Sequence, residues 1–337
     1  MFPPVIRRAV FWGFLLFPGV CLLPISCAED RPAGAPSQFR VTTYNVQNWR
    51  TTDRTVGGRY YRSAPKPDSE KQAVVSILKT INPDILAVQE MGTLSDFKDF
   101  QGHLVRVGLK YPYTEYITGF SSHGRIALLS RLPIARGRSH ANLQFKLSGQ
   151  TLGVLRGFID VDIDITPQMR VRILVAHLKS PRDDENGLDA EKIRLKEAAL
   201  LRDIIEEQLG REPESHLLVL GDFNDTPRSK TLKTITGAKK DPVHLFDLWI
   251  RDRQGDLWTH YYAGQKTYSP LDYIVVSQSL FIRWIRDSSQ SFIYREPDGA
   301  PEGLRWSSAS DHRPVTATFS VIPLPAARDV GEREPED

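Results

Sequence analysis

The stretch LLVLGDFND at residues 217–225 decides the fold, because an apolar run typical of a buried strand ends abruptly in Asp222 and Asn224. Side chains two residues apart point to the same side of an extended chain. A carboxylate and an amide oxygen at the end of a buried strand could form half of a site for a hard cation such as Mg2+, with a phosphate bound against it. The alternative interpretation is an Asx turn that closes the strand.

Four further segments place polar groups at a strand end or a strand start. The strand Phe39–Val46 stops at Asn45, Pro83–Glu90 ends in a carboxylate, Val171–Ser180 ends in His177 followed by Lys179, and Ser310–Pro314 precedes the strand Val315–Val321. Taken singly, each has an ordinary explanation as a turn residue, a solvated carboxylate or a buried histidine. Because strands that end at one edge of a sheet gather such residues in one cleft, the shared pattern favours a single site.

Six motifs together carry a family resemblance. In chain order they are Asn45, Gln89-Glu90, His177, Gly221-Asp222-Phe223-Asn224, Leu271-Asp272-Tyr273 and Ser310-Asp311-His312. In this order and at these distances they resemble the endonuclease/exonuclease/phosphatase superfamily, which includes deoxyribonuclease-I-like nucleases, abasic-site repair nucleases, sphingomyelinases and inositol-polyphosphate phosphatases. The resemblance covers about residues 38–321. Its specific part is Gly-Asp-Phe-Asn followed later by Ser-Asp-His, whereas the Asn45 segment alone would be weak.

The resemblance implies a four-layered α/β sandwich, with two packed mixed β-sheets flanked by helices and a site for phosphoester hydrolysis at one edge. It implies Mg2+ as the cofactor, with Mn2+ as a substitute. The implied metal residues are Glu90 as the main ligand, with Asn45 and Asp311 close to the metal. The implied catalytic residues are His312 as general base or phosphate-positioning group, Asp272 as its orienting partner, Asp222 and Asn224 for water and phosphate, and His177 at the phosphate and the leaving oxygen.

These roles also suit the chemistry. Phosphodiester cleavage needs neutralised phosphate oxygens, an in-line water and a stabilised leaving group. A histidine whose second nitrogen is held by a carboxylate has a fixed tautomer and is a better base. The sequence leaves open whether Asp222 or His312 takes the proton of the water.

Two departures from family members narrow the activity. Abasic-site repair enzymes carry a Tyr-x-Pro-Asn-type segment where this chain has Ala176-His177-Leu178-Lys179. Inositol phosphatases carry Cys-Asp-Arg around the position of Asp272, which here lies between Leu271 and Tyr273. The chain is most similar to deoxyribonuclease-I-like enzymes and secreted bacterial nucleases.

The segment from Trp49 to Lys71 is rich in basic and aromatic residues. It contains Arg50, Arg54, Arg59, Arg62, Lys66 and Lys71, interleaved with Trp49, Tyr60 and Tyr61. Because it follows Asn45, we expect a loop beside the cleft that offers phosphate contacts and stacking faces. The predicted substrate-binding residues are Arg50, Arg59 and Arg62 of this segment, together with Lys179. A solvated surface loop is the alternative.

The first 28 residues predict an export signal, with Arg7-Arg8, an apolar stretch Ala9–Ile25 and the small residues Ser26-Cys27-Ala28. A spanning helix is disfavoured because the apolar run is short and interrupted by glycine and proline. Residues Pro24–Cys27 form an imperfect lipobox, so lipid anchoring through Cys27 is an alternative. Both cysteines, Cys21 and Cys27, fall in this segment, and the mature domain therefore has no disulfide.

The rest of the chain predicts one catalytic domain. The expected parts are a linker at 29–37, the catalytic domain at 38–322 and a disordered tail at 323–337. The expected helices are Ser69–Ile81 and Leu188–Leu209, and the expected strands include Arg125–Ser130 and Val154–Ile165, the latter with Asp160, Asp162 and Asp164 on a solvent-exposed face. The net charge of +3 falls to +1 without Arg7 and Arg8, so global charge gives no argument for nucleic acid.

These features favour an exported, periplasmic or extracellular, Mg2+-dependent phosphodiesterase whose substrate is nucleic acid. We expect a monomer with no obligate protein partner, and membrane contact only if Cys27 is lipidated. One alternative is a sphingomyelinase-like lipid-headgroup phosphodiesterase. A third hypothesis, an inactive exported binding module, is weakened because every site position holds a competent residue.

Overall fold

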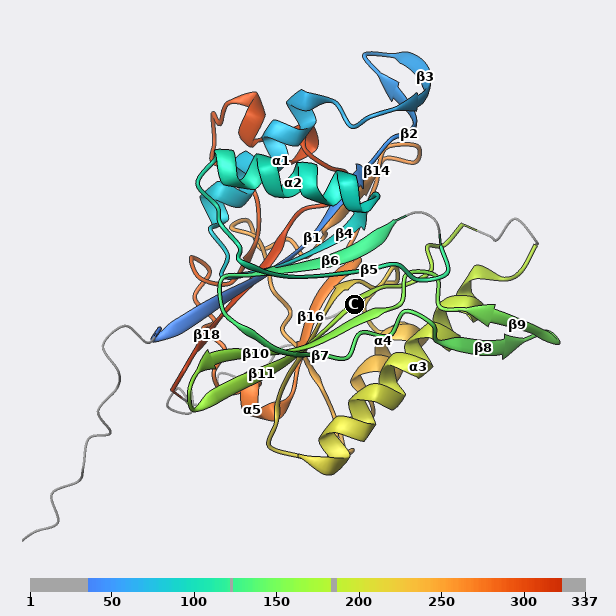
Figure 1. Cartoon of the computed structure of the whole chain (residues 1–337), viewed down its shortest axis with the longest axis vertical. Helices are drawn as coiled ribbons and strands as arrows, with labels where there is room; N and C mark the ends of the chain where they lie inside the picture. Colours follow the sequence, from blue (N-terminus) through green and yellow to red (C-terminus); the bar gives the residue numbers. More distant parts are fainter. Residues whose placement is uncertain (1–35, 122–123, 183–186, 323–337) are drawn as a thin grey trace, which may run out of the picture. The chain divides into compact units, whose positions relative to one another are not determined.

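Two mixed β-sheets lie face to face at the centre of the folded domain (Figure 1). The computed structural model describes residues 36–121, 124–182 and 187–322. The first six-stranded sheet has the order β17 (Phe292–Ile293), β18 (Val315–Ser320), β1 (Gln38–Trp49), β4 (Ile85–Met91), β6 (Arg125–Ser130) and β5 (Tyr113–Ile117). The second six-stranded sheet has the order β13 (Phe246–Asp247), β16 (Asp272–Val276), β12 (His216–Asp222), β11 (Met169–His177), β10 (Phe158–Thr166) and β7 (Ile134–Gly137). Both are antiparallel except for the parallel pairs β1–β4 and β11–β12.

Hairpins and helices extend from the two sheets. The hairpins are β2 (Thr52–Val56) with β3 (Arg59–Ala64), β8 (Gln144–Leu147) with β9 (Gln150–Gly153), and β14 (His260–Tyr262) with β15 (Thr267–Ser269). The helices are α1 (Asp68–Ile81), α2 (Leu94–Arg106), α3 (Ala190–Arg211), α4 (Lys230–Thr236) and α5 (Gln278–Phe281), with the 3-10 helices η1 (Glu302–Leu304) and η2 (Trp306–Ser308).

Three apolar clusters define four layers. Alternate strand residues of both sheets, such as Val41 and Leu220, interdigitate between the sheets. The opposite face of the first sheet packs against α1 and α2 through residues that include Leu86 and Ile77. The opposite face of the second sheet packs against α3 and α4, where Leu201 is fully buried. The predicted four-layered α/β sandwich is confirmed (Figure 1).

Most expected elements begin and end within a few residues of the observed ones. Helix α1 starts one residue before the predicted Ser69, and α3 is shifted by two residues, to Ala190–Arg211. The side chain of Asp189 caps α3 by accepting from the backbone amides of Glu191 and Lys192. The predicted export signal, all but two residues of the linker and the tail at 323–337 lie outside the described residues.

Gly221 allows β12 to lie close against β11. Its φ is 140°, and a Cβ built there would lie 1.9 Å from the carbonyl oxygen of Ala176. A larger residue would push the two strands apart exactly where the chain turns into Asp222, so this glycine sets the position of the motif.

The predicted solvent-exposed face of residues 154–165 is wrong at Asp160. This side chain is fully buried and accepts hydrogen bonds from Arg172 and Arg138. Arg172 also bonds Gln208 on α3, so the helix covers this part of the strand. Asp160 therefore belongs to a buried ion network, whereas the pair of Asp164 with Arg170 is exposed.

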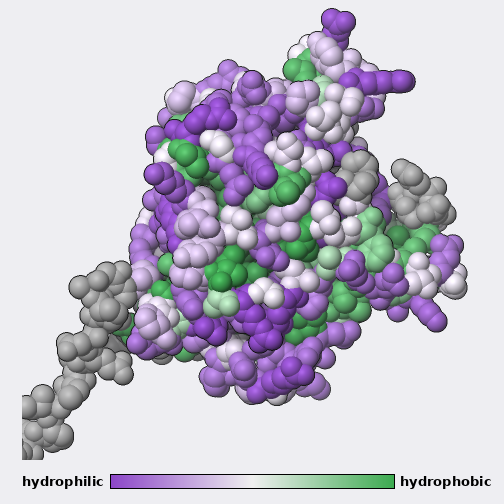
Figure 2. All heavy atoms as spheres, viewed as in Figure 1, coloured by the Kyte–Doolittle hydropathy of each residue, from purple (hydrophilic) through white to green (hydrophobic). Residues whose placement is uncertain are grey.

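The described surface has little continuous apolar area on the face drawn in Figure 2, where hydrophilic residues dominate and hydrophobic ones are scattered. Among the described helices, none is long and apolar enough to cross a membrane.

Candidate active site

The strand pairing brings the predicted residues to one edge of the two sheets. In the first sheet, β1 and β4 run parallel and pair Asn45 with Gln89. In the second, β11 and β12 run parallel and pair His177 with Asp222, while antiparallel β16 begins at Asp272, opposite Asp222. The carboxyl ends of four strands and the start of β16 therefore meet at the same edge.

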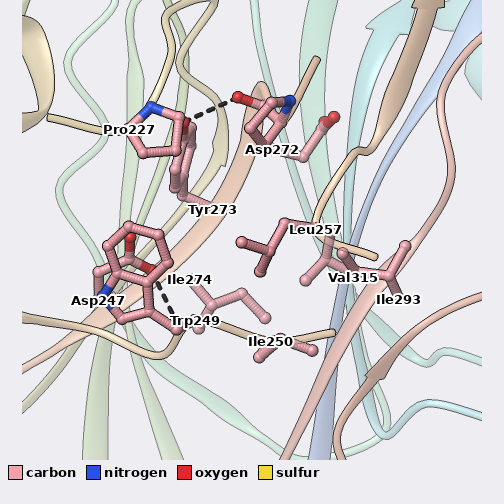
Figure 3. A pocket seen from close by; sticks show the side chains of 11 residues that line it. Pro227, Asp247, Trp249, Ile250, Leu257, Asp272, Tyr273, Ile274, Ile293 and Val315 are labelled. Atoms are coloured by element: carbon pink, nitrogen blue, oxygen red, sulfur yellow. Dashed lines mark hydrogen bonds between the residues drawn. The ribbon is translucent and has the colours of Figure 1, made fainter. Parts of the chain in front are cut away.

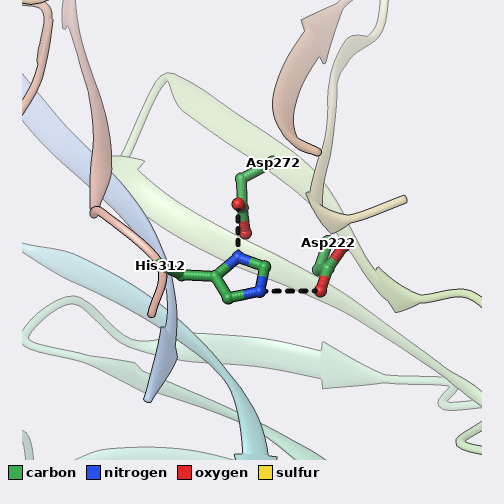
Figure 4. Close-up of side chains that lie close together, drawn as sticks. All are labelled: Asp222, Asp272 and His312. Carbon is green, nitrogen blue, oxygen red and sulfur yellow. Dashed lines mark hydrogen bonds and ion pairs between the residues drawn. The ribbon is translucent and has the colours of Figure 1, made fainter. Parts of the chain in front are cut away.

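His312 lies between two carboxylates (Figure 4). Its Nδ1 is 2.7 Å from Asp272 Oδ2, and its Nε2 is 3.7 Å from Asp222 Oδ2. All three side chains are buried. Because Asp272 holds Nδ1, the imidazole presents Nε2 to the side of the site where Asp222 lies.

Two hydroxyl groups hold this arrangement, one from Thr259, which the sequence analysis did not single out, and one from Ser310 of the Ser-Asp-His motif. Thr259 Oγ1 accepts from the backbone amides of Leu271 and Asp272, at 2.9 and 3.0 Å. Ser310 Oγ donates to the carbonyl oxygen of Asn45 at 2.8 Å and accepts from the amide of His312 at 3.1 Å. Rigid support of this kind fixes the positions of catalytic side chains.

Asp222 is the centre of the hydrogen-bond network. Its Oδ1 accepts from the amide of Asn224 at 2.9 Å, which is the Asx turn considered above. Its Oδ2 accepts from Asn45 Nδ2 at 3.0 Å and lies 3.5 Å from His177 Nε2. One carboxylate thus closes the strand with one oxygen and faces the site with the other. The side chain of Asn224 donates to the carbonyl oxygen of Leu178 at 2.9 Å.

The surroundings shift the pKa values of Asp222, His312 and His177 in different directions. Burial, reinforced by Asp272, raises the pKa of Asp222 to about 7. Burial alone would lower the pKa of His312, but the carboxylates of Asp272 and Asp222 raise it well above its usual value. Burial and the nearby Arg156 hold the pKa of His177 well below its usual value, so this ring is neutral at neutral pH.

Asn45 connects Asp222 to Glu90. Its Nδ2 also donates to Glu90 Oε1 at 3.3 Å, and its Oδ1 accepts from the amide of Gln47 at 3.0 Å. The other oxygen of Glu90 accepts from the amide of Asn48 at 2.8 Å. The amide group of Asn45 is thereby oriented with its nitrogen toward the two carboxylates.

The backbone around this edge is strained. Gln47, Asn48, Glu90 and Asn224 have φ values of 46°, 54°, 63° and 53°. Left-handed backbone is uncommon for residues other than glycine and clusters at functional sites. The register of β4 against β1 and β6 also shifts near Glu90. The irregularity turns this side chain out of the regular strand and toward the cleft edge.

The chemistry of the carboxylates of Glu90 and Asp311 fits a divalent cation. Both residues are partly exposed, and within the described part of the chain neither forms an ion pair with lysine or arginine. The amide of Asp311 donates to Gln47 Oε1 at 3.1 Å, which ties it to the same edge. Such hard oxygen donors suit Mg2+. The side chains of Asp222, Asp272 and His312 also offer atoms that can bind a metal, all within 4.8 Å of one another. The hydrogen bond between Asp272 and His312 already uses two of these atoms.

The predicted basic loop is the hairpin β2–β3, which projects from the sheets (Figure 1). Arg59, Tyr60, Tyr61 and Arg62 are exposed on β3, with the Arg59 guanidinium 5.4 Å from the centre of the Tyr61 ring. Burial lowers the pKa of Arg50, and the negative charge of Glu90 opposes this shift. Arg50 is therefore close enough to Glu90 to feel the charge of the site.

Two basic residues of this segment are not on an exposed loop. Arg54 donates to the carbonyl oxygens of Ala64, Asn48 and Arg50 and so fixes the base of the hairpin. Lys66 is buried. Its Nζ lies 3.1 Å from Glu70 Oε2. Both stabilise the local fold.

Lys179 is buried next to the loop after His177. Its backbone amide donates to Glu197 of α3 at 2.7 Å, and its Nζ donates to the carbonyl oxygen of Ser180 at 3.2 Å. Its place among the substrate-binding residues, like those of Arg50, Arg59 and Arg62, stays a prediction.

His260 was not predicted from the sequence. It starts β14 and forms a β-bridge with His312, and the centres of the two rings are 4.5 Å apart. The segment Trp-Thr-His-Tyr-Tyr at 258–262 has no preceding apolar run. Its density of aromatic residues was the available signal.

A small apolar cavity lies beside Asp272 (Figure 3). Its walls include Trp249, Leu257 and Ile274, and its volume is about 30 Å³. This is room for a water molecule and too little for a nucleotide. The cavity gives Asp272 an apolar neighbourhood.

Comparisons with known proteins identify the family and the fold. The sequence model of the Endonuclease/Exonuclease/phosphatase family matches residues 42–312. A comparison with curated proteins finds no match.

Solved structures share the fold. The human Nocturnin catalytic domain with bound sulfate is 18% identical, with a TM-score of 0.57, over 84% of this chain and 94% of that chain. The 3′ phosphatase NExo from Neisseria, bound to a product DNA hairpin, is 17% identical, with a TM-score of 0.56, over 84% of this chain and 99% of that chain. Truncated TDP2 from Caenorhabditis elegans is 17% identical, with a TM-score of 0.54, over 84% and 97%. At these identities the likeness concerns the fold alone.

Proposed function

Because the chain belongs to the endonuclease/exonuclease/phosphatase family, whose members are metal-dependent phosphoric ester hydrolases, we propose that it is an exported, Mg2+-dependent nuclease. One observation carries the proposal. A continuous hydrogen-bonded network joins Glu90 through Asn45 to Asp222, and His312 with Asp272 faces the same carboxylate. A carboxylate that can bind a metal ion therefore lies next to a hydrogen-bonded histidine–aspartate pair, and phosphodiester hydrolysis uses both kinds of group.

Glu90 and Asp311 would hold the cation, with Asn45 beside it and Mn2+ as a substitute for Mg2+. When bound, the cation supplies charge neutralisation on the phosphate oxygens. The Asn45 amide keeps Glu90 and Asp222 at fixed separation, since its nitrogen bonds both.

The protein's own groups manage the proton and the phosphate. Asp272 fixes His312 so that Nε2 and Asp222 Oδ2 face the same space. Because the carboxylates hold the pKa of His312 well above its usual value, this ring carries a proton at neutral pH, and Asp222, whose pKa is about 7, takes the proton of the attacking water. His177, kept neutral by burial, donates an N–H hydrogen bond to a phosphate oxygen. Asn224 holds the loop at Leu178 and keeps its amide oxygen for water or phosphate.

The choice of nucleic acid is supported by the β2–β3 hairpin. Its strand β3 exposes two arginines and two tyrosines, side chains that can bind phosphates and stack on bases. The export part of the proposal is supported by the signal-like pattern of residues 1–28.

One parallel assay tests the proposal. Purified protein is incubated with Mg2+ and closed circular plasmid, linear DNA, RNA or sphingomyelin, with and without a chelator. We expect cleavage of nucleic acid that stops on chelation, and nicking of the closed circle would identify an endonuclease. Headgroup release from sphingomyelin alone would replace the nuclease with the lipid phosphodiesterase. Full turnover after exhaustive chelation would reject the mechanism.

A double-mutant cycle tests the His312–Asp272 pair. His312→Ala and Asp272→Asn should each lower turnover about 10²–10⁴-fold. The combined loss should be well below the product of the two, because the residues act as one unit. Circular dichroism and thermal unfolding serve as controls for folding. Near wild-type turnover of His312→Ala would remove the histidine from the mechanism.

A further inference from the structure

Four aromatic side chains pack together beside the candidate active site, on the hairpin β14–β15, on the residues that lead into it and on η2. We call this group the aromatic patch, and its members are Trp258, Tyr261, Tyr268 and Trp306. The ring centre of Tyr268 lies 4.6 Å from that of Trp258 and 4.8 Å from that of Tyr261. The ring of Trp306 contacts Trp258 and Tyr261 at 5.2 and 6.1 Å. Each ring is therefore held in place by two others.

The aromatic patch is attached to the segment that carries the catalytic groups. The amide of Tyr261 donates to the carbonyl oxygen of Asp311 at 2.9 Å. The guanidinium of Arg313, the residue after His312, lies 3.3 Å from the centre of the Trp258 ring. A nucleic-acid strand with one phosphate against His312 would therefore place its neighbouring nucleotides beside the patch.

Tyr268 is the outermost ring of the aromatic patch. Its side chain is 55% exposed, whereas the other three members are partly buried. A ring that is fixed by two neighbours and still exposed can stack on a base with little further loss of conformational freedom. Tyr268 therefore has the surroundings of a stacking platform.

A polar pocket borders the patch. Its volume is about 230 Å³, and the charged residues of its wall are Arg253, Arg295, Arg305, Glu296 and Asp298. The guanidinium of Arg295 lies 5.7 Å from the centre of the Trp258 ring, and Arg305 directly precedes Trp306. The pocket and the aromatic patch thus share a boundary.

Arg305 is the arginine of this pocket whose charge is not paired. Arg253 and Arg295 each form ion pairs with carboxylates. The carboxylate of Glu296 accepts from the amide of Trp306 at 3.4 Å. The side chain of Arg305 is exposed and, within residues 36–121, 124–182 and 187–322, forms no hydrogen bond or ion pair. Its guanidinium is therefore free to bind an anion such as a phosphate.

We propose that the aromatic patch and Arg305 bind unpaired nucleotides beside the scissile bond, so that the substrate of this chain is single-stranded nucleic acid. Tyr268 stacks on a base, and Arg305 binds a phosphate of the same strand. A base inside a duplex is covered on both faces by its neighbours, whereas an unpaired base offers a face to an aromatic side chain. The inference rests on the proposed function, since it names the form of nucleic acid that the same site would cleave.

The competing explanation for the aromatic patch is packing alone, in which the rings only stabilise the hairpin. Tyr268→Ala removes the outermost ring, and Tyr268→Phe keeps it. Arg305→Ser removes the unpaired charge. Tyr113→Ala is the matched control, because this tyrosine is 39% exposed on β5 at the edge of the first sheet.

The test measures binding by fluorescence anisotropy, with Mg2+ present and with labelled oligonucleotides whose phosphorothioate linkages resist cleavage. Each variant is titrated with a single strand and with the duplex of the same sequence, at several salt concentrations. We expect the wild type to bind the single strand about tenfold or more tightly than the duplex. Tyr268→Ala should weaken single-strand binding about 5- to 150-fold and duplex binding much less, whereas Tyr268→Phe and Tyr113→Ala should stay close to wild type. Arg305→Ser should lower the salt slope for the single strand by about 0.7, the value for one lost phosphate contact.

The outcomes separate this inference from the proposed function. A wild type that cleaves nucleic acid but binds duplex as tightly as single strand would overturn the inference alone. Equal losses on both forms in Tyr268→Ala, or a lower melting temperature with unchanged binding, would assign the patch to packing. An unchanged salt slope in Arg305→Ser would remove this arginine from the site. A wild type that neither binds nor cleaves either form would overturn the proposed nuclease together with the inference.

Discussion

Asp160 and Asp222 are both fully or almost fully buried carboxylates on the second sheet, yet their surroundings differ in charge. Asp160 accepts from Arg172 Nε at 2.8 Å and from Arg138 Nη2 at 3.2 Å, with His140 Nε2 at 3.1 Å. Burial alone would raise the pKa of Asp160, but these three partners lower it well below its usual value. Asp160 is thus kept ionised by hydrogen bonds from two arginines.

Among the described residues, Asp222 has no arginine partner. It accepts from the neutral groups of Asn45 and Asn224 and lies near His312, which Asp272 already engages. Burial therefore dominates and leaves its pKa near 7. The comparison indicates that one network is arranged for a fixed charge and the other for a charge that can change, which is what a group that exchanges a proton needs.

The largest effect should come from Asp222→Asn. This variant removes the exchangeable charge while it keeps a side chain of the same size. Turnover on the best phosphodiester should fall about 10²–10⁴-fold. Steady-state kinetics at saturating Mg2+ measures the loss, and circular dichroism controls for folding. Turnover within a few fold of wild type would show that the two aspartates do not differ in this way.

Asp160→Asn should have the opposite effect, because it should lower the stability of the protein and leave its turnover unchanged. Loss of its charge leaves the partly buried Arg172 without its carboxylate partner, while Arg138 keeps Asp162, so the free energy of unfolding should fall by about 3–5 kcal/mol. Turnover per folded molecule should stay close to wild type. Urea unfolding measures the loss, with Asp164→Asn as the matched control, because its pair with Arg170 is exposed. A loss for Asp160→Asn no larger than that of the control would contradict the prediction.

The two aspartates should also give opposite pH dependence in metal-free protein. Asp160 has a lowered pKa, so its contribution to stability is present above about pH 4 and is lost as pH falls below its unfolded value. Asp222 has a raised pKa, so its contribution is present below about pH 4 and is lost as pH rises toward about 7. Relative to wild type, Asp222→Asn should therefore gain stability as the pH rises from about 4 to 7, whereas the stability lost in Asp160→Asn should be constant above about pH 4 and should shrink as the pH falls below it. Unfolding in urea with chelator, from below pH 4 up to pH 7, checks both, and a pH-dependent difference in the same window for both variants would refute the assignment.

The sheet edge that carries the candidate site could be predicted from sequence because its residues follow apolar runs that are typical of strands. Asn45, His177 and Asp222 each end an apolar run, and strands that run parallel end at the same edge. The Gly-Asp-Phe-Asn motif added the register, since Gly221 allows the close approach of β11. Local pattern and chain order thus indicated that these residues share one edge, whereas their individual roles came from the family resemblance and stay predictions.

The rest depends on contacts between distant segments. The alternation of residues around Asp160 predicts a solvent-exposed side chain, but Arg138 and α3 cover it in the structure. A local sequence pattern cannot predict packing by a helix that lies more than 30 residues away in the chain. Thr259 and His260 belong to a short hairpin whose alternation is too brief to recognise. The sequence shows Lys66 as one charge in a basic loop, whereas in the structure its buried Nζ bonds Glu70 on α1 and the carbonyl oxygen of Gln47.

The smallest effect concerns the β2–β3 hairpin, whose charges are solvated, unlike those around either aspartate. Arg59 and Arg62 are the exposed arginines of β3, whereas Arg54 supports the hairpin and should be left in place. The double variant Arg59→Ser with Arg62→Ser should weaken nucleic-acid binding and lower the slope of log affinity against log salt by up to about 2, because fewer counterions are released. Turnover of a small activated diester, which cannot reach these side chains, should barely change. Arg211→Ser, an exposed arginine at the end of α3, is the matched control. Equal losses on polymer and small diester would mean that the hairpin supports the fold, and an unchanged salt slope would remove it from the nucleic-acid contact.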